Sequence, residues 1–187
     1  MGLSDWDLVQ RCRQGDVAAF QELVSRCYQK VYMVVLGIVN NPDDALDVAQ
    51  ESFFRAYKKI GEFQGGSTFY TWVYRIAVNL AIDFQRRQKR NPTELRDVLE
   101  GLDETGERAS RPGDNPHLAV EHKQMGQRIM AAINDLTPDH KAVIVLRAIE
   151  GLSYKEIGEI LGCSEGTVMS RLHYARKRLM EKLEAYL

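Results

Sequence analysis

The sequence has few of the features that mark membrane, secreted or disulfide-stabilised proteins. Its longest apolar run, residues 31–39, has nine residues and contains a glycine, which is too short to cross a bilayer. The first seven residues lack the basic start and apolar stretch of a secretory signal. The three cysteines cannot all pair with one another, and none forms a CxxC motif. These absences predict a reduced cytoplasmic protein, not inserted in a membrane, whose cysteines serve packing.

An excess of one charge sign is also missing. The 187 residues hold 25 Lys and Arg against 26 Asp and Glu, for a formal net charge of −1. This balance argues against a chain that coats nucleic acid by bulk attraction, although it leaves room for local basic patches. Charged residues at 27% and hydrophobic residues at 44% indicate a folded globular protein of one large or two small domains.

Catalytic and metal-binding motifs are absent as well. The four histidines, His117, His122, His140 and His173, offer no metal-ligand spacing such as HExxH. No glycine-rich phosphate loop precedes a helix, because Gly65-Gly66 is too short for that role. We therefore expect no metal, no cofactor and no enzymatic activity.

Helical periodicity runs through the chain, and strand-like alternation persists nowhere, so the predicted fold is all-α. Residues 31–39 have the composition of a buried strand, but their helical neighbours favour a helix. Capping signals set the expected starts: Ser4 with Asp7, Asp16, Asn41-Pro42, Thr137-Pro138, Ser153 with Glu156, and Ser164. The expected helices are 5–14, 17–39 in one or two pieces, 42–59, 68–90, 116–134, 138–150, 154–161 and 165–185.

Residues 91–117 differ in character from the rest. They carry seven acidic residues against three basic ones and hold three glycines and three prolines. This composition predicts a flexible acidic linker. The linker divides the chain into a first helical domain, residues 1–90, and a second, residues 118–187.

The sharpest local motif is a helix-turn-helix at residues 151–172. Two short helices flank Gly162, and apolar residues sit where the helices must pack against each other. From residue 163 to residue 182, five basic residues face two acidic ones. A basic helix of this kind fits the major groove of DNA. The plainer alternative is an ordinary helical hairpin with a solvated basic face.

A second motif is the long helix 69–90. Aromatic residues crowd its start and basic residues its end, for a net charge of +4. Taken alone, the aromatic stripe is explained by core packing. Beside the polar loop that precedes it, the helix also offers what unstacked bases require, namely rings for stacking and cations for phosphates.

A third motif is acidic. Asp43, Asp47 and Glu51 recur every four residues, so they share one helix face. The face is either simply solvated or a docking strip for a basic partner helix.

Together these motifs resemble a bacterial RNA polymerase sigma factor. Residues 47–57, then 69–79, then the helix-turn-helix are similar to the extracytoplasmic-function (ECF) group of the sigma-70 family, which keeps only the domains called region 2 and region 4. The similarity covers nearly the whole chain except the linker. It implies two small helical domains and a subunit that binds core polymerase and directs promoter-specific initiation at −35 duplex and melted −10 DNA. The alternative is a helix-turn-helix regulator that acts without polymerase.

The resemblance also implies partners. An anti-sigma protein is inferred by analogy, and the second domain resembles the one that sits on the polymerase β flap. The first domain resembles the one that docks on the β′ coiled coil, through the acidic face. The residues of this face are Asp43, Asp47, Gln50, Glu51 and Phe54.

The same resemblance assigns DNA-contact residues. The −10 set, which includes a loop that captures a flipped base, is Phe63, Gln64, Ser67, Tyr70, Trp72, Arg75, Asn79 and Arg86. The −35 set is Thr167, Met169, Ser170, Arg171, His173, Tyr174, Arg176 and Lys177. Met169 stands where many relatives have Arg or Lys, so one groove contact becomes apolar, and a Met can touch a thymine methyl.

Overall fold

The computed structural model describes residues 2–90, 129 and 131–184. Across these residues the chain is helical and contains no strand, which confirms the all-α prediction. The predicted linker lies outside the described residues, as does most of the helix expected over 116–134, although residues 131–134 are helical.

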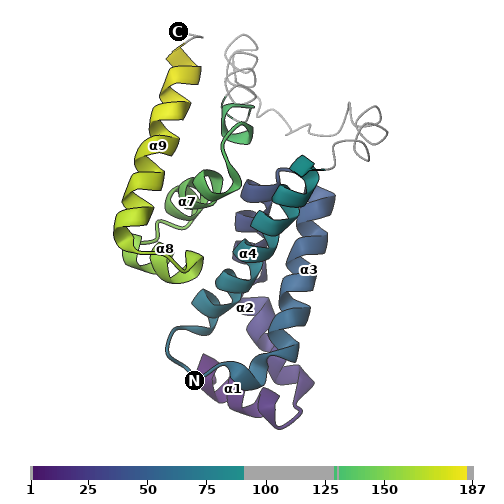
Figure 1. Ribbon diagram of the computed structural model, residues 1–187. Coiled ribbons are helices and arrows are strands. Elements are labelled where there is room, and N and C mark those ends of the chain that lie inside the picture. Colours follow the sequence, from purple (N-terminus) through teal and green to yellow (C-terminus); the bar gives the residue numbers. More distant parts are fainter. Residues whose placement is uncertain (1, 91–128, 130, 185–187) are drawn as a thin grey trace, which may run out of the picture.

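The first half is a helical bundle built around one long helix (Figure 1). Its members are α1 (Asp5–Arg13), α2 (Val17–Val39), α3 (Pro42–Lys58) and α4 (Phe69–Arg90). Helix α2 contacts each of the other three. Residues 31–39 form the last part of α2, with Val31, Val34, Val35 and Ile38 fully buried. Their apolar character on several sides of the helix follows from this central position.

Side-chain caps begin the helices where the sequence predicts. Ser4 and Asp7 form a capping box at α1, and the Asp16 carboxylate accepts the Ala19 amide at α2. Asn41 accepts two backbone amides at the start of α3. Each cap satisfies amides that a helix start leaves without partners. For the helices that lie within the described residues, the predicted boundaries are confirmed to within about one residue.

The segment between α3 and α4 is less irregular than predicted. Residues 61–67, which the sequence predicts to be a loop, begin inside a single 3-10 turn, η1 (Ile60–Glu62), whose Ile60 is buried. The Arg13 guanidinium of α1 donates to the carbonyls of Ile60, at 3.4 Å, and Gly61, at 3.3 Å, and also to that of Phe63. This long-range anchor holds the loop that follows.

The second half contains α7 (Pro138–Ile149), α8 (Tyr154–Leu161) and α9 (Glu165–Glu184). Helices α8 and α9 form the predicted helix-turn-helix, and Gly162 ends α8 with a left-handed φ of 64°. A Cβ on Gly158 would lie 2.7 Å from the Cys163 carbonyl oxygen, so glycine permits the tight turn. Ile157, Val168 and Leu172 are buried between the helices, as expected.

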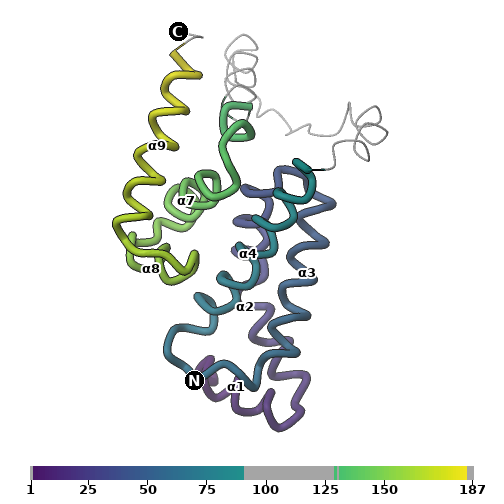
Figure 2. The backbone as a smooth tube through the Cα atoms, viewed as in Figure 1, coloured from purple at the N-terminus to yellow at the C-terminus, as the bar shows by residue number. Residues whose placement is uncertain are grey.

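The two halves pack directly on each other. Helix α7 contacts α2 and α4, and α8 contacts α4, as the backbone trace shows (Figure 2). Gly37 of α2 permits this approach, because a Cβ there would lie 2.9 Å from Val145 Cγ1 and 3.2 Å from Ile149 Cδ1. The helical spacing of Val143, Ile144, Leu146 and Ile149 predicts that all four face the interior of the second domain. Ile149 is 46% exposed, so the prediction is wrong for this residue. It lies at the end of α7 and packs only one side against α2.

Candidate nucleic-acid and polymerase interfaces

The predicted −10 surface is built from loop 63–68 and the first turns of α4. Thr68 begins the helix by accepting the Thr71 amide through its hydroxyl. The Phe63 ring is buried and packs 5.2 Å from Trp72 and 6.0 Å from Phe69, measured between ring centroids. Phe69 and Tyr74 are also buried. Phe63 and Phe69 therefore pack together beneath the loop, whereas the Tyr74 ring packs against Tyr70.

The polar members of the −10 set point outward. Arg75, Asn79 and Arg86 are exposed and follow one another at helical spacing, so they form a row along one side of α4. Gln64 is exposed beside them, and Ser67 and Trp72 are half-buried. Five of the eight predicted −10 residues line one pocket, namely Phe63, Gln64, Ser67, Trp72 and Arg75. Asn79 and Arg86 continue the row along α4, whereas Tyr70 lies on another side of the helix.

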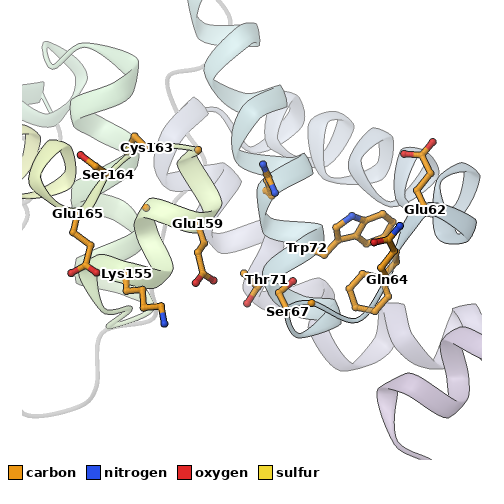
Figure 3. A pocket seen from close by; sticks show the side chains of 15 residues that line it. Glu62, Gln64, Ser67, Thr71, Trp72, Lys155, Glu159, Cys163, Ser164 and Glu165 are labelled. Carbon is orange, nitrogen blue, oxygen red and sulfur yellow. The ribbon is translucent and has the colours of Figure 1, made fainter.

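A pocket of about 800 Å³ lies between this surface and the helix-turn-helix. Gln64, Ser67, Thr71, Trp72 and Arg75 line one wall, among others. Figure 3 shows the opposite wall, where Lys155 and Glu159 project from α8 and Glu165 begins α9. This juxtaposition has no local signal in the sequence, because the two walls are about 90 positions apart.

Two predicted −10 residues are bound to carboxylates of the second half. The Tyr70 hydroxyl is hydrogen-bonded to the Tyr74 hydroxyl and to the Glu150 carboxylate. Burial, then Glu150, raises the Tyr70 pKa well above its usual range. Arg86 donates to Asp139 at 2.8 Å.

The predicted −35 helix α9 presents most of its assigned residues to solvent. Met169 is 55% exposed and Tyr174 is 60% exposed. Ser170, His173, Arg176 and Lys177 are exposed as well, while Thr167 is half-buried against the Ser164 cap.

Arg171 is the exception on α9. Its side chain is 27% exposed and donates to Asp139 at 3.1 Å. Asp139 thus holds Arg171 of α9 and Arg86 of α4 at the same time. The structure therefore places Arg171 in a half-buried ion pair rather than free on the groove-facing side.

The predicted polymerase-binding residues all lie on the exposed side of α3. Asp43, Asp47, Gln50 and Glu51 are exposed, and Phe54 is 52% exposed. Glu51 pairs with Arg55 at 2.7 Å. Leu46, which is not among the predicted residues, is 40% exposed and precedes Gln50 and Phe54 by four and eight residues. The eight-residue spacing between Leu46 and Phe54 places both on one helix face, and this spacing is the sequence signal that could have identified Leu46. The α3 face, residues 43, 46, 47, 50, 51 and 54, is therefore apolar as well as acidic.

The three cysteines are not paired with one another. Cys12 and Cys27 are buried, Cys163 is half-buried, and all three are free thiols. Burial raises the pKa of Cys27 to about 12. Within the described part of the chain, no three His, Cys, Asp or Glu side chains gather in a metal-binding group, and no helix is long and apolar enough to span a membrane.

Comparison with known protein families matches both halves. The sigma-70 region 2 model matches residues 23–91, and the sigma-70 region 4 model matches residues 126–179. The ECF RNA polymerase sigma-E factor of Haemophilus influenzae is 40% identical over 184 residues, covering 97% of this chain and 96% of that protein. The RNA polymerase sigma-H factor of Pseudomonas aeruginosa is 34% identical over 184 residues, covering 98% of this chain and 95% of that protein.

Solved structures agree on the fold. A sigma factor RpoE in a complex with the anti-sigma factor NepR from Bartonella quintana has a TM-score of 0.61 at 25% identity, covering 88% of this chain and 96% of that one. The structure of CnrH in complex with the cytosolic domain of CnrY has a TM-score of 0.67 at 24% identity, covering 97% of both chains.

Regions 2 and 4 in this order define the class, a sigma-70-type transcription initiation factor. Similarity over nearly its whole length shows that the chain belongs to the ECF RNA polymerase sigma factors. The predicted sigma-factor function is thereby confirmed. The alternative of a regulator that acts without polymerase accounts only for the helix-turn-helix, and not for the region 2 match.

Proposed function

We propose that this sigma factor divides promoter recognition between its two halves. The α3 face binds core RNA polymerase, loop 63–68 with α4 reads the melted −10 element, and α9 reads the −35 duplex. The observation that carries the proposal is the exposed row Arg75, Asn79 and Arg86 beside a polar loop, within the part that matches region 2. The opposite, buried face of α4 packs in the hydrophobic core of the first half and takes no part in this surface.

The chemistry of the row suits single-stranded DNA. Arginines at both ends supply cations for phosphates, and the Asn79 amide supplies a donor and an acceptor for a base edge. Trp72, half-buried at the loop, offers a partly exposed ring for stacking. A melted strand running along α4 meets these groups in succession.

The −35 proposal rests on a different surface. Met169, His173 and Arg176 follow at helical spacing on the exposed side of α9, so they enter a groove together. Arg176 supplies the bidentate donor that guanine edges accept, and Met169 supplies an apolar contact for a thymine methyl. Arg171 stabilises the fold through its ion pair with Asp139, and it reads DNA directly only where DNA displaces that carboxylate.

The partners follow from the family and from the relatives. Core polymerase binds with its β′ coiled coil on the α3 face and its β flap on the second half. The structural relative RpoE is in complex with the anti-sigma factor NepR, so an anti-sigma protein is proposed here too. The chain works in the cytoplasm, is not itself an enzyme, and consists of the domains 1–90 and 118–187 joined by the linker 91–117. The matched ranges 23–91 and 126–179 support this division.

Transcription in vitro tests the proposal. Core polymerase with the full chain is incubated with a library of genomic fragments, and start sites are mapped by sequencing. We expect a set of start sites that share one −35 and one −10 element and that core polymerase alone does not use. Start sites without a shared element, or identical to those of core alone, contradict the proposal.

Asn79→Ala separates the −10 role from polymerase binding. We expect the variant to bind core normally but to open promoters poorly, with permanganate reactivity of −10 thymines reduced about ten-fold. Gln29→Ala, an exposed α2 residue outside the predicted interfaces, is the matched control. Unchanged permanganate footprints argue against the assignment of Asn79.

A further inference from the structure

Trp6 is an exposed tryptophan that none of the assigned roles explains. It lies in the first turn of α1 and is 44% exposed, although tryptophan is among the residues that folding usually buries most. Its ring lies against loop 63–68, where a Cβ on Gly65 would be 2.8 Å from Trp6 Cζ3 and 3.2 Å from Cε3. Gly65 has a φ of 75°, so the loop approaches the ring with bare backbone.

The ring forms one wall of a pocket of about 430 Å³. Phe63 adds a second aromatic surface, with its centroid 6.2 Å from that of Trp6. Groups that hydrogen-bond complete the lining, which consists of Asp5, Trp6, Phe63, Gln64, Gly65, Ser67, Thr68 and Phe69. Every one of these residues belongs to the first half. The pocket is therefore present whatever the position of α8, unlike the 800 Å³ pocket that shares loop 63–68.

The Arg13 side chain stabilises this arrangement of the Trp6 ring and the loop. Its guanidinium lies 5.6 Å from the Trp6 ring centroid and donates to three carbonyls between Ile60 and Phe63. The ring and the loop are thus held by the same side chain, so the opening between them is defined before a ligand arrives. Such preorganisation lowers the entropic cost of binding.

An aromatic wall with amide and hydroxyl groups around it fits one class of ligand, an unpaired nucleobase. Unpaired bases are recognised by stacking on aromatic rings and by hydrogen bonds to their exposed edges. Asp5 and Gln64 offer acceptors for exocyclic amines, and Ser67 and Thr68 offer hydroxyls for ring nitrogens and carbonyls.

We propose that Trp6 is a specificity-determining residue of the −10 interaction, with its ring stacking on a base extruded from the non-template strand beside loop 63–68. The proposal rests on the proposed function, and it assigns a contact to α1, outside the residues 23–91 that match region 2. Selection at one −10 position then depends on a residue of α1 as well as on the loop and α4.

The test compares two replacements that differ in one property. Trp6→Phe keeps an aromatic face, whereas Trp6→Leu keeps apolar cover over Gly65 and removes the ring. Leu3→Ala is the matched control, because Leu3 is also 44% exposed, lies three residues away and does not line the pocket. Holoenzyme made with each full-length variant is assayed on promoters that carry each of the four bases at every −10 position.

We expect Trp6→Leu to lose about ten-fold of the base preference at a single −10 position and to leave the other positions unchanged. Trp6→Phe retains most of the preference. Promoters with altered −35 elements respond equally in all holoenzymes.

Photocross-linking tests the base contact directly, because a Trp6 side chain that only packs against the loop would not cross-link to DNA. Halogenated bases are placed one at a time along the non-template −10 strand, irradiated in the holoenzyme complex, and the cross-linked peptide is identified. We expect the position with the lost preference to cross-link to Trp6.

The possible outcomes distinguish a failure of the Trp6 inference from a failure of the proposed function. If wild-type and Leu3→Ala holoenzymes initiate normally and Trp6→Leu keeps the full base preference, Trp6 only covers the loop and the inference is wrong. If Trp6→Leu loses preference but the cross-link falls on Trp72 alone, stacking on Trp6 is also excluded. If no holoenzyme, wild type included, initiates at specific promoters, the proposed function itself fails, and the inference with it.

Discussion

Arg171 and Arg176 are five residues apart on α9, yet their surroundings differ. Arg176 is exposed, whereas Arg171 is half-buried and pairs with Asp139. We expect Arg176→Ala to cost about 1–3 kcal/mol of binding at the preferred −35 sequence and to relax discrimination at one base pair. Competition between −35 point variants on the holoenzyme measures this. Binding weakened equally on every sequence would show that Arg176 contacts phosphate instead.

Arg171→Ala serves as the comparison for that experiment. Removing Arg171 leaves Asp139 with Arg86 as its remaining ion-pair partner. We therefore expect a lower melting temperature and little change in −35 base preference. A selective loss of preference at one base pair, with an unchanged melting temperature, would show that Arg171 leaves Asp139 and reads DNA directly.

Lys141 makes stability depend on pH. It is 2% exposed, its ammonium donates to Asn134 at 2.7 Å, and burial, followed by nearby Lys89, lowers its pKa to about 8. Below pH 8 the folded chain carries the full cost of a buried charge. Between pH 8 and the unfolded value near 10.4, the unfolded chain binds more protons, so this group's contribution to the unfolding free energy rises with pH.

Lys141→Met removes that cost. We expect the variant to be more stable than wild type at pH 7, by on the order of 1–3 kcal/mol, and the difference to shrink by pH 10. Urea unfolding at both pH values measures the difference, with Lys155→Met, an exposed position, as control. An equal gain at both pH values would assign the effect to apolar packing alone.

At the scale of elements, the helices were predictable because their signals are local. Each side-chain cap, such as Ser153 with Glu156, joins residues only three positions apart. The 3-10 turn η1 was missed because a distant residue, Arg13 of α1, holds it. The exposure of Ile149 was missed because it depends on how α7 meets α2.

The same distinction applies to the candidate sites. Exposed rows on α3 and α9 follow from helical periodicity, so the sequence places them well. The occupation of Arg171 and Arg86 by Asp139 depends on contacts between residues 32 and 53 positions apart, which periodicity does not contain. The role proposed for Trp6 has no local sequence signal for the same reason, since its contact with Gly65 joins residues 59 positions apart.

The α3 face combines acidic and apolar groups, and that combination leads to a prediction. We expect Asp47→Lys to lower affinity for core polymerase about ten-fold at low salt and less at high salt, because a charge facing a basic partner helix is reversed. Glu51→Lys is expected to behave similarly, with an additional loss of the Arg55 pair. Glu22→Lys, an exposed reversal on α2, is the control for general charge effects. Titration of labelled protein with core measures the affinities, and equal affinities for Asp47→Lys and Glu22→Lys contradict the assignment.

At the scale of the whole molecule, the near-zero net charge is a cancellation between surfaces that meet. Carboxylates of the second half, Asp139 and Glu150, bind Arg86 and Tyr70 of the predicted −10 surface. A phosphate or base approaching these two residues must displace an existing partner. The free chain in this arrangement is therefore expected to bind −10 DNA weakly, and separation of the halves should strengthen binding.

Gly37→Leu tests this expectation by wedging the halves apart. A side chain at Gly37 meets Val145 of α7, since even a Cβ would lie 2.9 Å away. We expect a larger radius of gyration in solution scattering and a 5- to 10-fold gain in affinity of the free chain for a −10 single strand, within the usual range of coupling between sites. Gln29→Leu adds the same side chain to an exposed position of α2 and should change neither quantity. If Gly37→Leu expands the protein without raising DNA affinity, the carboxylates do not compete with DNA, and core polymerase must activate the −10 surface by some means other than separating the halves.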